Sequence, residues 1–353
     1  MTRWRVWTLL VLGGCVLDGG PDRTDDPTDG GPEVEEDPPR SPLALPLVPP
    51  DPADNVTSPE KVALGRLLFW DPVLSGDRTV ACATCHDPDL AYTDGRATPI
   101  GVTKNSMTIL DAAWNGTTAT RLLLRAEDAP MFWDNRVHSL EAQARGPITA
   151  TAEMLGTSYT AETIFPELVV RLSAIPEYAT RFTAVFGAGP INDVKIVAAI
   201  AAFERTLTTP QTSYDRFVNG DRNALSAQAQ RGLDVFTNNG CVNCHSGPMF
   251  SDFELHDLGV PDPAGRLLMR TASLRNVTLT APYMHNGVFP GFQQVFGFYR
   301  NAGQNARDPK LRGVQPPTPQ QAPDVIAFLT AISDGAFDRT IPTSVPSGLP
   351  PGG

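Results

Sequence analysis

Two short stretches of the same form decide the fold: "CATCH" at Cys82–His86 and "CVNCH" at Cys241–His245. In each, two cysteines separated by two residues are followed directly by a histidine, the spacing that attaches a c-type haem. The thiols bond to the haem vinyl groups, and the imidazole supplies an axial ligand to the iron. A redox-active dithiol does not explain the histidine after each pair, and a shared zinc site would have to join segments more than 150 residues apart. We therefore predict two covalent haems, held by Cys82, Cys85 and His86 and by Cys241, Cys244 and His245.

The remaining cysteine, Cys15, belongs to a different pattern at the N-terminus. Arg3 and Arg5 precede an apolar run over residues 6–12, which is too short to span a membrane and is typical of an export signal. Residues 12–15, "LGGC", resemble the bacterial lipobox, in which cleavage leaves the cysteine as the lipidated first residue. The alternative is an ordinary signal peptide with an incidental cysteine. We expect a protein on the periplasmic side of a bacterial membrane, anchored through Cys15 or otherwise soluble in the periplasm.

Charge and composition divide the 353 residues into five parts. Most of the net charge of −11 lies in residues 18–40. The rest of the chain offers no basic patch for nucleic acid. An acidic stretch rich in proline and glycine has almost nothing to bury and is typical of a solvated tether. The predicted parts are a signal peptide (1–15), a disordered tether (16–50), an N-terminal haem domain (51–220), a C-terminal haem domain (221–342) and a tail (343–353).

A faint internal repeat supports two haem modules. Gly65–Phe69 precedes the first cysteine pair and Gly232–Phe236 precedes the second, each with glycine and phenylalanine four positions apart on an amphipathic helix. Ser58 and Ser226 are suitable N-caps for these helices. The apolar run 194–207 lacks glycine and proline and predicts a buried helix. Because strand-like alternation is rare elsewhere, we predict a mainly α fold: two cytochrome c-like haem domains with long loops and little strand.

Longer motifs identify a family. They are "FWDNR" at Phe132–Arg136, "LEAQ" at Leu140–Gln143, "GPI" at Gly146–Ile148 and "TASLRNVTLTAPYMHNG" at Thr271–Gly287. On these residues the chain, from about Pro50 to Pro342, resembles the bacterial di-haem cytochrome c peroxidase and MauG family. The resemblance implies that the first haem binds peroxide, that the second relays or stores an oxidising equivalent, and that a tryptophan lies between them.

The resemblance also implies three catalytic residues. Breaking the O–O bond of peroxide requires a proton to move from its inner to its outer oxygen, so a carboxylate over the open haem face is useful. Glu153 matches the distal glutamate of the family, and Gln143 matches its companion amide. Trp133 matches the tryptophan between the haems. An isolated glutamate is usually a solvated loop residue, but the position of Glu153 shortly after "GPI" favours the catalytic role.

Further family positions concern calcium and a histidine. Asn105 aligns with an asparagine that helps to bind calcium, with more ligands expected from backbone oxygens near Thr271 and Ser273. Oxygen ligands suit Ca²⁺, although Ala272 stands where the family often has proline. His285 matches a position near the second haem, where a hydrogen bond to cofactor or backbone is expected rather than iron ligation.

Two departures from the peroxidase pattern indicate the MauG-like subtype. Many peroxidases carry a distal histidine in an Ile-Gly-His segment that must leave the first iron before peroxide binds, whereas this chain has Val102 there. Tyr299 stands fourteen residues after His285, where the peroxidases have a methionine ligand and MauG-like enzymes have tyrosine. A phenolate favours oxidised iron and a thioether favours reduced iron, so ligation by Tyr299 would lower the potential of the second haem. An ordinary packed aromatic is the alternative for Tyr299.

The sequence thus predicts a di-haem c-type peroxidase that reduces hydrogen peroxide to water with electrons from a small cytochrome c or a cupredoxin. The first alternative is a MauG-like or MbnH-like oxidase that modifies a partner protein encoded alongside it. Residues 238–240 provide no aromatic side chain before the second cysteine pair, where MauG has the tryptophan that passes oxidising equivalents to its protein substrate. The second alternative is a di-haem electron carrier that is not an enzyme.

Overall fold

The computed structural model describes residues 40–99, 101–122, 125–265, 267–302 and 307–353. The predicted signal peptide, the lipobox with Cys15 and most of the predicted tether lie outside these residues. Within the described ranges, no helix is both long and apolar enough to cross a membrane.

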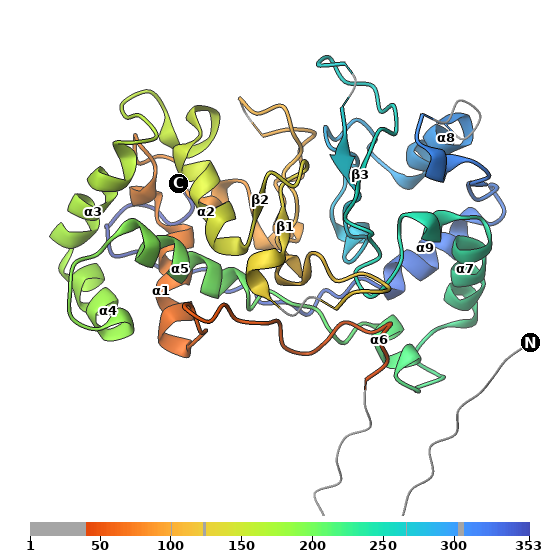
Figure 1. Ribbon diagram of the computed structural model, residues 1–353, viewed down its shortest axis with the longest axis horizontal. Helices are drawn as coiled ribbons and strands as arrows, with labels where there is room; N and C mark the ends of the chain where they lie inside the picture. Colours follow the sequence, from red (N-terminus) through yellow and green to blue (C-terminus); the bar gives the residue numbers. More distant parts are fainter. Residues whose placement is uncertain (1–39, 100, 123–124, 266, 303–306) are drawn as a thin grey trace, which may run out of the picture. The chain divides into compact units, whose positions relative to one another are not determined.

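Helices make up most of the regular structure (Figure 1). They are α1 (Pro59–Trp70), α2 (Leu140–Thr149), α3 (Ile164–Ala174), α4 (Pro176–Phe186), α5 (Asp193–Glu204), α6 (Ser213–Val218), α7 (Ala227–Asn238), α8 (Phe292–Ala302) and α9 (Ala322–Ala331). The strands β1 (Pro130–Met131) and β2 (Val137–His138) form one antiparallel ladder, and β3 (Leu255–His256) and β4 (Met269–Arg270) form another. The prediction of a mainly helical fold with little strand is confirmed.

The two glycines of the internal repeat mark two close helix crossings. Gly65 places α1 against α5, because a Cβ atom there would lie 1.9 Å from the carbonyl oxygen of Ala199. Gly232 places α7 against α9, because a Cβ atom there would lie 1.9 Å from the carbonyl oxygen of Asp324. Only glycine permits such an approach of two backbones. The repeat in the sequence therefore reflects one helix crossing used twice.

The phenylalanines of the repeat occupy equivalent places in the two helix pairs. Phe69 packs against Phe203 of α5 with ring centroids 5.2 Å apart, and Phe236 packs against Phe328 of α9 at 5.1 Å. All four side chains are buried. Burial of each contributes about 1.5–3 kcal/mol of hydrophobic stabilisation, so each crossing is the centre of a separate apolar core.

Local sequence signals explain where these helices begin. The hydroxyl oxygens of Ser58 and Ser226 accept hydrogen bonds from the backbone N–H three residues later, at 3.2 and 3.1 Å. Both are N-caps, as predicted. Most of the apolar run 194–207 lies in α5, in which every residue from Ile196 to Glu204 is buried, and the helix ends at Glu204, three residues before the end of the run. The prediction of a buried helix is confirmed.

Each cysteine pair lies on its own core. Cys82 packs against the core that contains Phe69 and Phe203. Cys241 packs against the core that contains Phe236 and Phe328. The segments that attach the cofactors are therefore each supported by one of the two helix crossings.

The last residues of the chain pack against the core that contains Phe69 and Phe203. Val345 is buried there. The backbone N–H of Gly352 donates to the carbonyl oxygen of Trp70 at 2.8 Å, and the Thr84 hydroxyl donates to the carbonyl oxygen of Gly352 at 2.7 Å. Since Thr84 lies inside the first Cys-x-x-Cys-His segment, the predicted tail (343–353) packs directly beside it.

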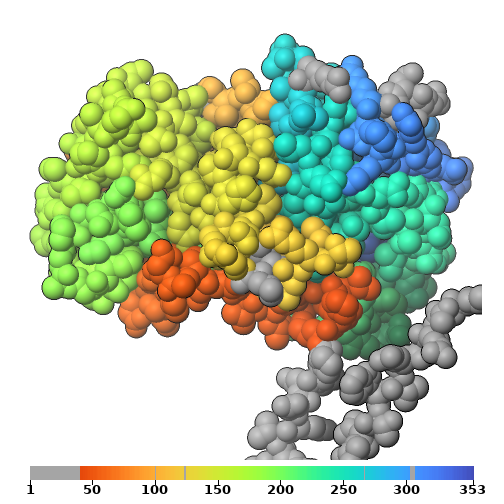
Figure 2. All heavy atoms as spheres, viewed as in Figure 1, coloured from red at the N-terminus to blue at the C-terminus, as the bar shows by residue number. Residues whose placement is uncertain are grey.

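The β1–β2 ladder lies beside the segment that contains β3 and β4. The backbone N–H of Arg270 donates to the carbonyl oxygen of Trp133 at 2.7 Å, and the Asn135 amide donates to the carbonyl oxygen of Phe253 at 2.8 Å. Figure 2 shows the two segments, yellow and teal, next to each other on one face. Trp133 is thereby held between residues that follow the two cysteine pairs.

Candidate functional site

The first attachment segment is a short 3₁₀ turn that presents one histidine. Cys82–Thr84 forms the turn, and His86 follows it. The Nδ1 atom of His86 lies 2.9 Å from the carbonyl oxygen of Tyr92 and donates to it, which leaves Nε2 free to bind a metal. Burial lowers the pKa of His86, so the ring is neutral, as iron ligation requires.

The second attachment segment repeats this geometry. Cys241–Asn243 forms a 3₁₀ turn, and the Nδ1 atom of His245 donates to the carbonyl oxygen of Phe250 at 3.0 Å. Burial again lowers the pKa of the imidazole. None of Cys82, Cys85, Cys241 and Cys244 forms a disulfide. Both segments therefore offer two free thiols and one oriented imidazole.

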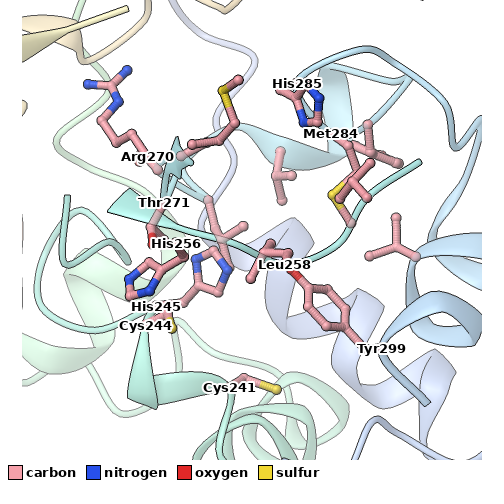
Figure 3. Close-up of a pocket in the computed structure, with 18 of the residues that line it drawn as sticks. Cys241, Cys244, His245, His256, Leu258, Arg270, Thr271, Met284, His285 and Tyr299 are labelled. Atoms are coloured by element: carbon pink, nitrogen blue, oxygen red, sulfur yellow. The ribbon is translucent and has the colours of Figure 1, made fainter. Parts of the chain in front are cut away.

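A cavity adjoins the second segment. Cys241, Cys244 and His245 line one side of it, and Tyr299, carried by α8, lies across the cavity from His245 (Figure 3). The remaining wall is largely apolar and includes Phe296. An apolar wall with an imidazole and a phenol on opposite sides fits a haem, and the structure brings Tyr299 and His245 to the same cavity.

The environment of Tyr299 favours a neutral phenol unless a cation is present. Burial raises the pKa of Tyr299, and the nearby sulfurs of Cys244 and Cys241 would raise it further if they were ionised. A phenolate there requires positive charge at its oxygen, such as that of a haem iron. The role of Tyr299 as an iron ligand remains a prediction.

Glu153 lies near the first attachment segment. It belongs to a π-helical turn, Thr151–Leu155, of a kind that is frequent at functional sites. Met154 and Leu155, which follow Glu153, lie in the apolar core against which Cys82 packs, and a charge on Glu153 would raise the pKa of both Cys82 and Cys85. The residue is exposed, yet the surrounding protein removes enough water from its carboxyl to raise the pKa of Glu153. Gln143 is half-buried on α2, and no hydrogen bond joins it to Glu153 among the described residues.

Trp133 contacts one segment that follows the first cysteine pair and one that follows the second. Its indole N–H donates to the carbonyl oxygen of Asn105 at 2.9 Å, and its ring lies edge-on to that of His285 with centroids 6.4 Å apart. The backbone N–H of Asn105 in turn donates to the carbonyl oxygen of His285 at 2.7 Å. Asn105 follows the first cysteine pair and His285 follows the second, so Trp133 contacts both segments, and its role between the haems remains a prediction.

The predicted calcium residues have other partners. The Asn105 amide nitrogen donates to the carbonyl oxygens of Arg96 and Ala97 at 2.8 and 3.2 Å. The carbonyl oxygen of Thr271 accepts a hydrogen bond from the Ser251 hydroxyl at 2.6 Å. In the part of the chain that the structure describes, no hydrogen bond joins Asn105 to Thr271, and calcium binding remains a prediction.

His285 finds a partner that sequence reasoning did not foresee. Its Nε2 atom lies 2.8 Å from a carboxylate oxygen of Asp262, and both side chains are buried. This partner of Nε2 is a carboxylate, and the expected hydrogen bond of His285 to cofactor or backbone remains a prediction. Burial lowers the pKa of His285, while Asp262 opposes this change.

Comparison with known proteins decides the family. The family model described as di-haem cytochrome c peroxidase matches residues 59–223. The methylamine utilization protein MauG of Methylorubrum extorquens is 36% identical over 318 residues, which cover 83% of this chain and 84% of that protein. The cytochrome-c peroxidase IdrP1 of a Pseudomonas species is 35% identical over 348 residues, covering 83% and 86%. This chain belongs to the di-haem cytochrome c peroxidase family. It is therefore a di-haem c-type cytochrome and an oxidoreductase.

The fold comparison agrees with this family. The crystal structure of a MauG-like protein associated with microbial copper homeostasis matches with a TM-score of 0.70 and 27% identity, covering 83% of this chain and 95% of that one. The prediction of the di-haem peroxidase and MauG family, made from motifs, is confirmed.

Sequence reasoning missed a buried carboxyl in this di-haem protein. Glu204, at the end of α5, is 5% exposed, and its carboxyl makes no hydrogen bond to any described residue. Burial raises the pKa of Glu204 to about 8, with repulsion by Glu141 adding to the shift and attraction by Arg205 opposing it. A charge on Glu204 would raise the pKa of Cys82, so the carboxyl lies close to the first attachment segment. The available signal was one acidic residue closing an otherwise apolar helix.

Proposed function

We propose that this protein reduces hydrogen peroxide to water at its first haem, with electrons that a small cytochrome c or a cupredoxin delivers to its second haem. The observation that carries the proposal is the position of Glu153 directly before Met154 and Leu155, which belong to the core against which Cys82 of the first attachment segment packs. In the sequence, Val102 stands where many relatives have a histidine that ligates the first iron. Its absence supports a first iron that can bind peroxide directly.

The proposed mechanism assigns proton movement to Glu153. Cys82, Cys85 and His86 would hold the first haem, which would supply a metal centre for peroxide and the electrons for cleavage of its O–O bond. The Glu153 carboxylate accepts the proton of the inner peroxide oxygen and returns it to the outer oxygen, which leaves as water. Its raised pKa brings the carboxyl closer to neutral pH, where one group can both accept and donate a proton. The amide of Gln143 orients the peroxide.

The electron path is proposed to run through Trp133. Its contacts with Asn105, which follows the first cysteine pair, and with His285, which follows the second, support this role. Residues 51–220 would form the peroxide-reducing domain and residues 221–342 the electron-transfer domain, each built around one of the two helix crossings. His245 and Tyr299 would hold the second iron.

The comparison that tests this function is between Glu153→Gln and Glu127→Gln. Glu127 is an exposed glutamate that pairs with Arg125 on the surface, so its change controls for the loss of one carboxylate. Peroxide is added to the fully oxidised protein, without prior reduction, and turnover is followed with a reduced small cytochrome as donor. We expect kcat/KM for peroxide to fall about 10²–10⁴-fold in Glu153→Gln and to stay unchanged in the control. Equal rates in the two variants would remove Glu153 from the mechanism, and the absence of any turnover in the wild type would favour an electron carrier.

Oxidation of a partner protein is the second candidate function. The position of Tyr299 across the cavity from His245 favours it, because MauG-like enzymes are the members with tyrosine at this place. Residues 238–240 contain no aromatic side chain, so the route to a partner would differ from that of MauG. Chemical modification of a protein encoded beside this one, dependent on peroxide, would establish this function in place of the first.

Two further features belong to the proposal. Export and anchoring through Cys15 would hold the enzyme on the periplasmic side of a bacterial membrane, and a Cys15→Ser variant should then leave the membrane fraction. A calcium ion bound by Asn105 and by the backbone at Thr271 would lie between the haem domains. Isothermal titration of the chelated, haem-loaded protein with Ca²⁺ tests this site, and an Asn105→Ala variant should lose the binding.

A further inference from the structure

A buried cation lines the cavity of the second haem. Arg270 of β4 is 5% exposed and is one of the residues of the cavity wall. One guanidinium nitrogen donates to the carbonyl oxygen of Pro130 at 2.6 Å, and another lies 3.4 Å from the sulfur of Met107. The Nε atom has no hydrogen-bond partner among the residues that the structure describes. Burial lowers the pKa of Arg270 to about 10, so the side chain is still positively charged at neutral pH.

Arg270 differs from the other buried arginines of the described chain. Arg171 pairs with Glu167, Arg205 with Glu141 and Arg275 with Asp215, at 2.7–2.8 Å. No carboxylate in the described ranges forms an ion pair with Arg270.

The one carboxylate whose charge reaches Arg270 does not neutralise it. Asp134 raises the pKa of the guanidinium slightly against the effect of burial. Its side chain, however, is exposed and pairs with Arg136 at 2.9 Å. A buried charge without a partner is strongly unfavourable, so such cations are normally held by an anion. The pocket therefore requires an anion that the described residues do not supply.

The cofactor of this cavity carries such anions. A c-type haem has two propionate carboxylates at the edge opposite its vinyl groups, and the vinyl groups must face Cys241 and Cys244. The planar guanidinium is suited to a carboxylate, and the residue lies in the wall of the cavity. We propose that Arg270 binds a propionate of the second haem.

This ion pair would raise the reduction potential of the second haem. The backbone N–H of Arg270 donates to the carbonyl oxygen of Trp133, so the cation is attached to the proposed electron path. With Arg270 present, the propionate is neutralised and the reduced iron is less disfavoured by nearby negative charge. Arg270 is thus a positioning residue: it sets the potential of the second haem and holds the edge of that haem beside Trp133.

The test measures the midpoint potential of each haem in the haem-loaded protein, without peroxide. Potentiometric titration followed by optical and EPR spectra resolves the two irons. In Arg270→Gln, the unpaired propionate should lower the potential of the second haem by about 59 mV or more, which corresponds to a tenfold change in the equilibrium constant for its reduction. Arg270→Lys keeps the charge and should shift the potential less. Arg231→Gln, on the exposed face of α7, is the control and should leave both potentials unchanged.

Two results would overturn the proposal. A shift confined to the first haem would assign the carboxylate to that cofactor, and equal potentials in Arg270→Gln and the control would show that no carboxylate is bound. If Arg270→Gln fails to load haem, a crystal structure of the haem-loaded wild type decides, because a propionate oxygen must then lie within hydrogen-bond distance of the guanidinium. These outcomes do not depend on peroxide turnover, so they separate this ion pair from the proposed function.

Discussion

Replacing Gly232 by alanine should destabilise the second haem module. The new Cβ atom would lie 1.9 Å from the carbonyl oxygen of Asp324 and 3.0 Å from the Cβ atom of Phe328. Because real Cβ contacts essentially never fall below 3.0 Å, the oxygen and the methyl group must separate by at least about 1.1 Å. A gap of 0.5–1 Å between facing atoms already removes roughly a quarter to a half of their dispersion energy. Helices α7 and α9 therefore cannot keep their present packing.

The expected net loss follows from two opposing effects. Overpacking of this kind costs about 3 kcal/mol or more of the free energy of unfolding, whereas the better helix propensity of alanine returns about 1 kcal/mol. We expect a net loss of about 2 kcal/mol or more. The equivalent change at Gly65, where a Cβ atom would lie 1.9 Å from the carbonyl oxygen of Ala199, should cost a similar amount in the first module.

Guanidinium unfolding of the haem-loaded protein, followed by far-UV circular dichroism, measures the effect. Gly335→Ala is the matched control, because its Cβ atom would meet only the end of the Arg339 side chain at 3.9 Å. The control should be as stable as the wild type or more stable by up to about 1 kcal/mol. A Gly232→Ala protein with the midpoint of the control would refute the account of the two helix crossings.

Two other changes test the electrostatics of the haem sites. The pKa of Glu204 in the folded protein is raised to about 8 from 4.5, so the wild type should lose up to about 5 kcal/mol of unfolding free energy as the pH rises from 4.5 through 8. Glu204→Gln should abolish that loss in thermal unfolding measured across this pH range, and an unchanged pH profile would show that the carboxyl is not neutral in the folded state. Tyr299→Met should raise the midpoint potential of the second haem in a redox titration, since a thioether favours reduced iron. An unaltered potential would mean that Tyr299 does not bind the iron.

Local patterns predicted most of the fold. The glycine and phenylalanine of each repeat are four positions apart on one helix, and that spacing is visible in sequence because the helix itself creates it. The partner residues Ala199 and Asp324 are far away in the chain and belong to helices without a matching motif. Sequence therefore indicated that two similar modules exist, while the structure was needed to show which helices cross.

The candidate site divides in the same way. The attachment histidines were predicted from the Cys-x-x-Cys-His motifs, and Tyr299 was predicted from its spacing to His285 in the family pattern. The uncompensated charge of Arg270 and the neutral carboxyl of Glu204 arise from burial, which depends on segments that pack from elsewhere in the chain. A single arginine before Thr271, or one glutamate at the end of an apolar run, carries no local sign of being buried without a partner.

EPR of the fully oxidised protein, before and after addition of peroxide, tests the central claim most directly. The account predicts two different ferric signals at rest: one from a first iron held by His86 with no protein ligand opposite, and one from a second iron held by His245 and Tyr299. Peroxide should diminish both signals without prior reduction. The contrary result would be two resting signals that each require two protein ligands and that do not change with peroxide. It would contradict the claim that the ferric first iron can bind peroxide without prior reduction.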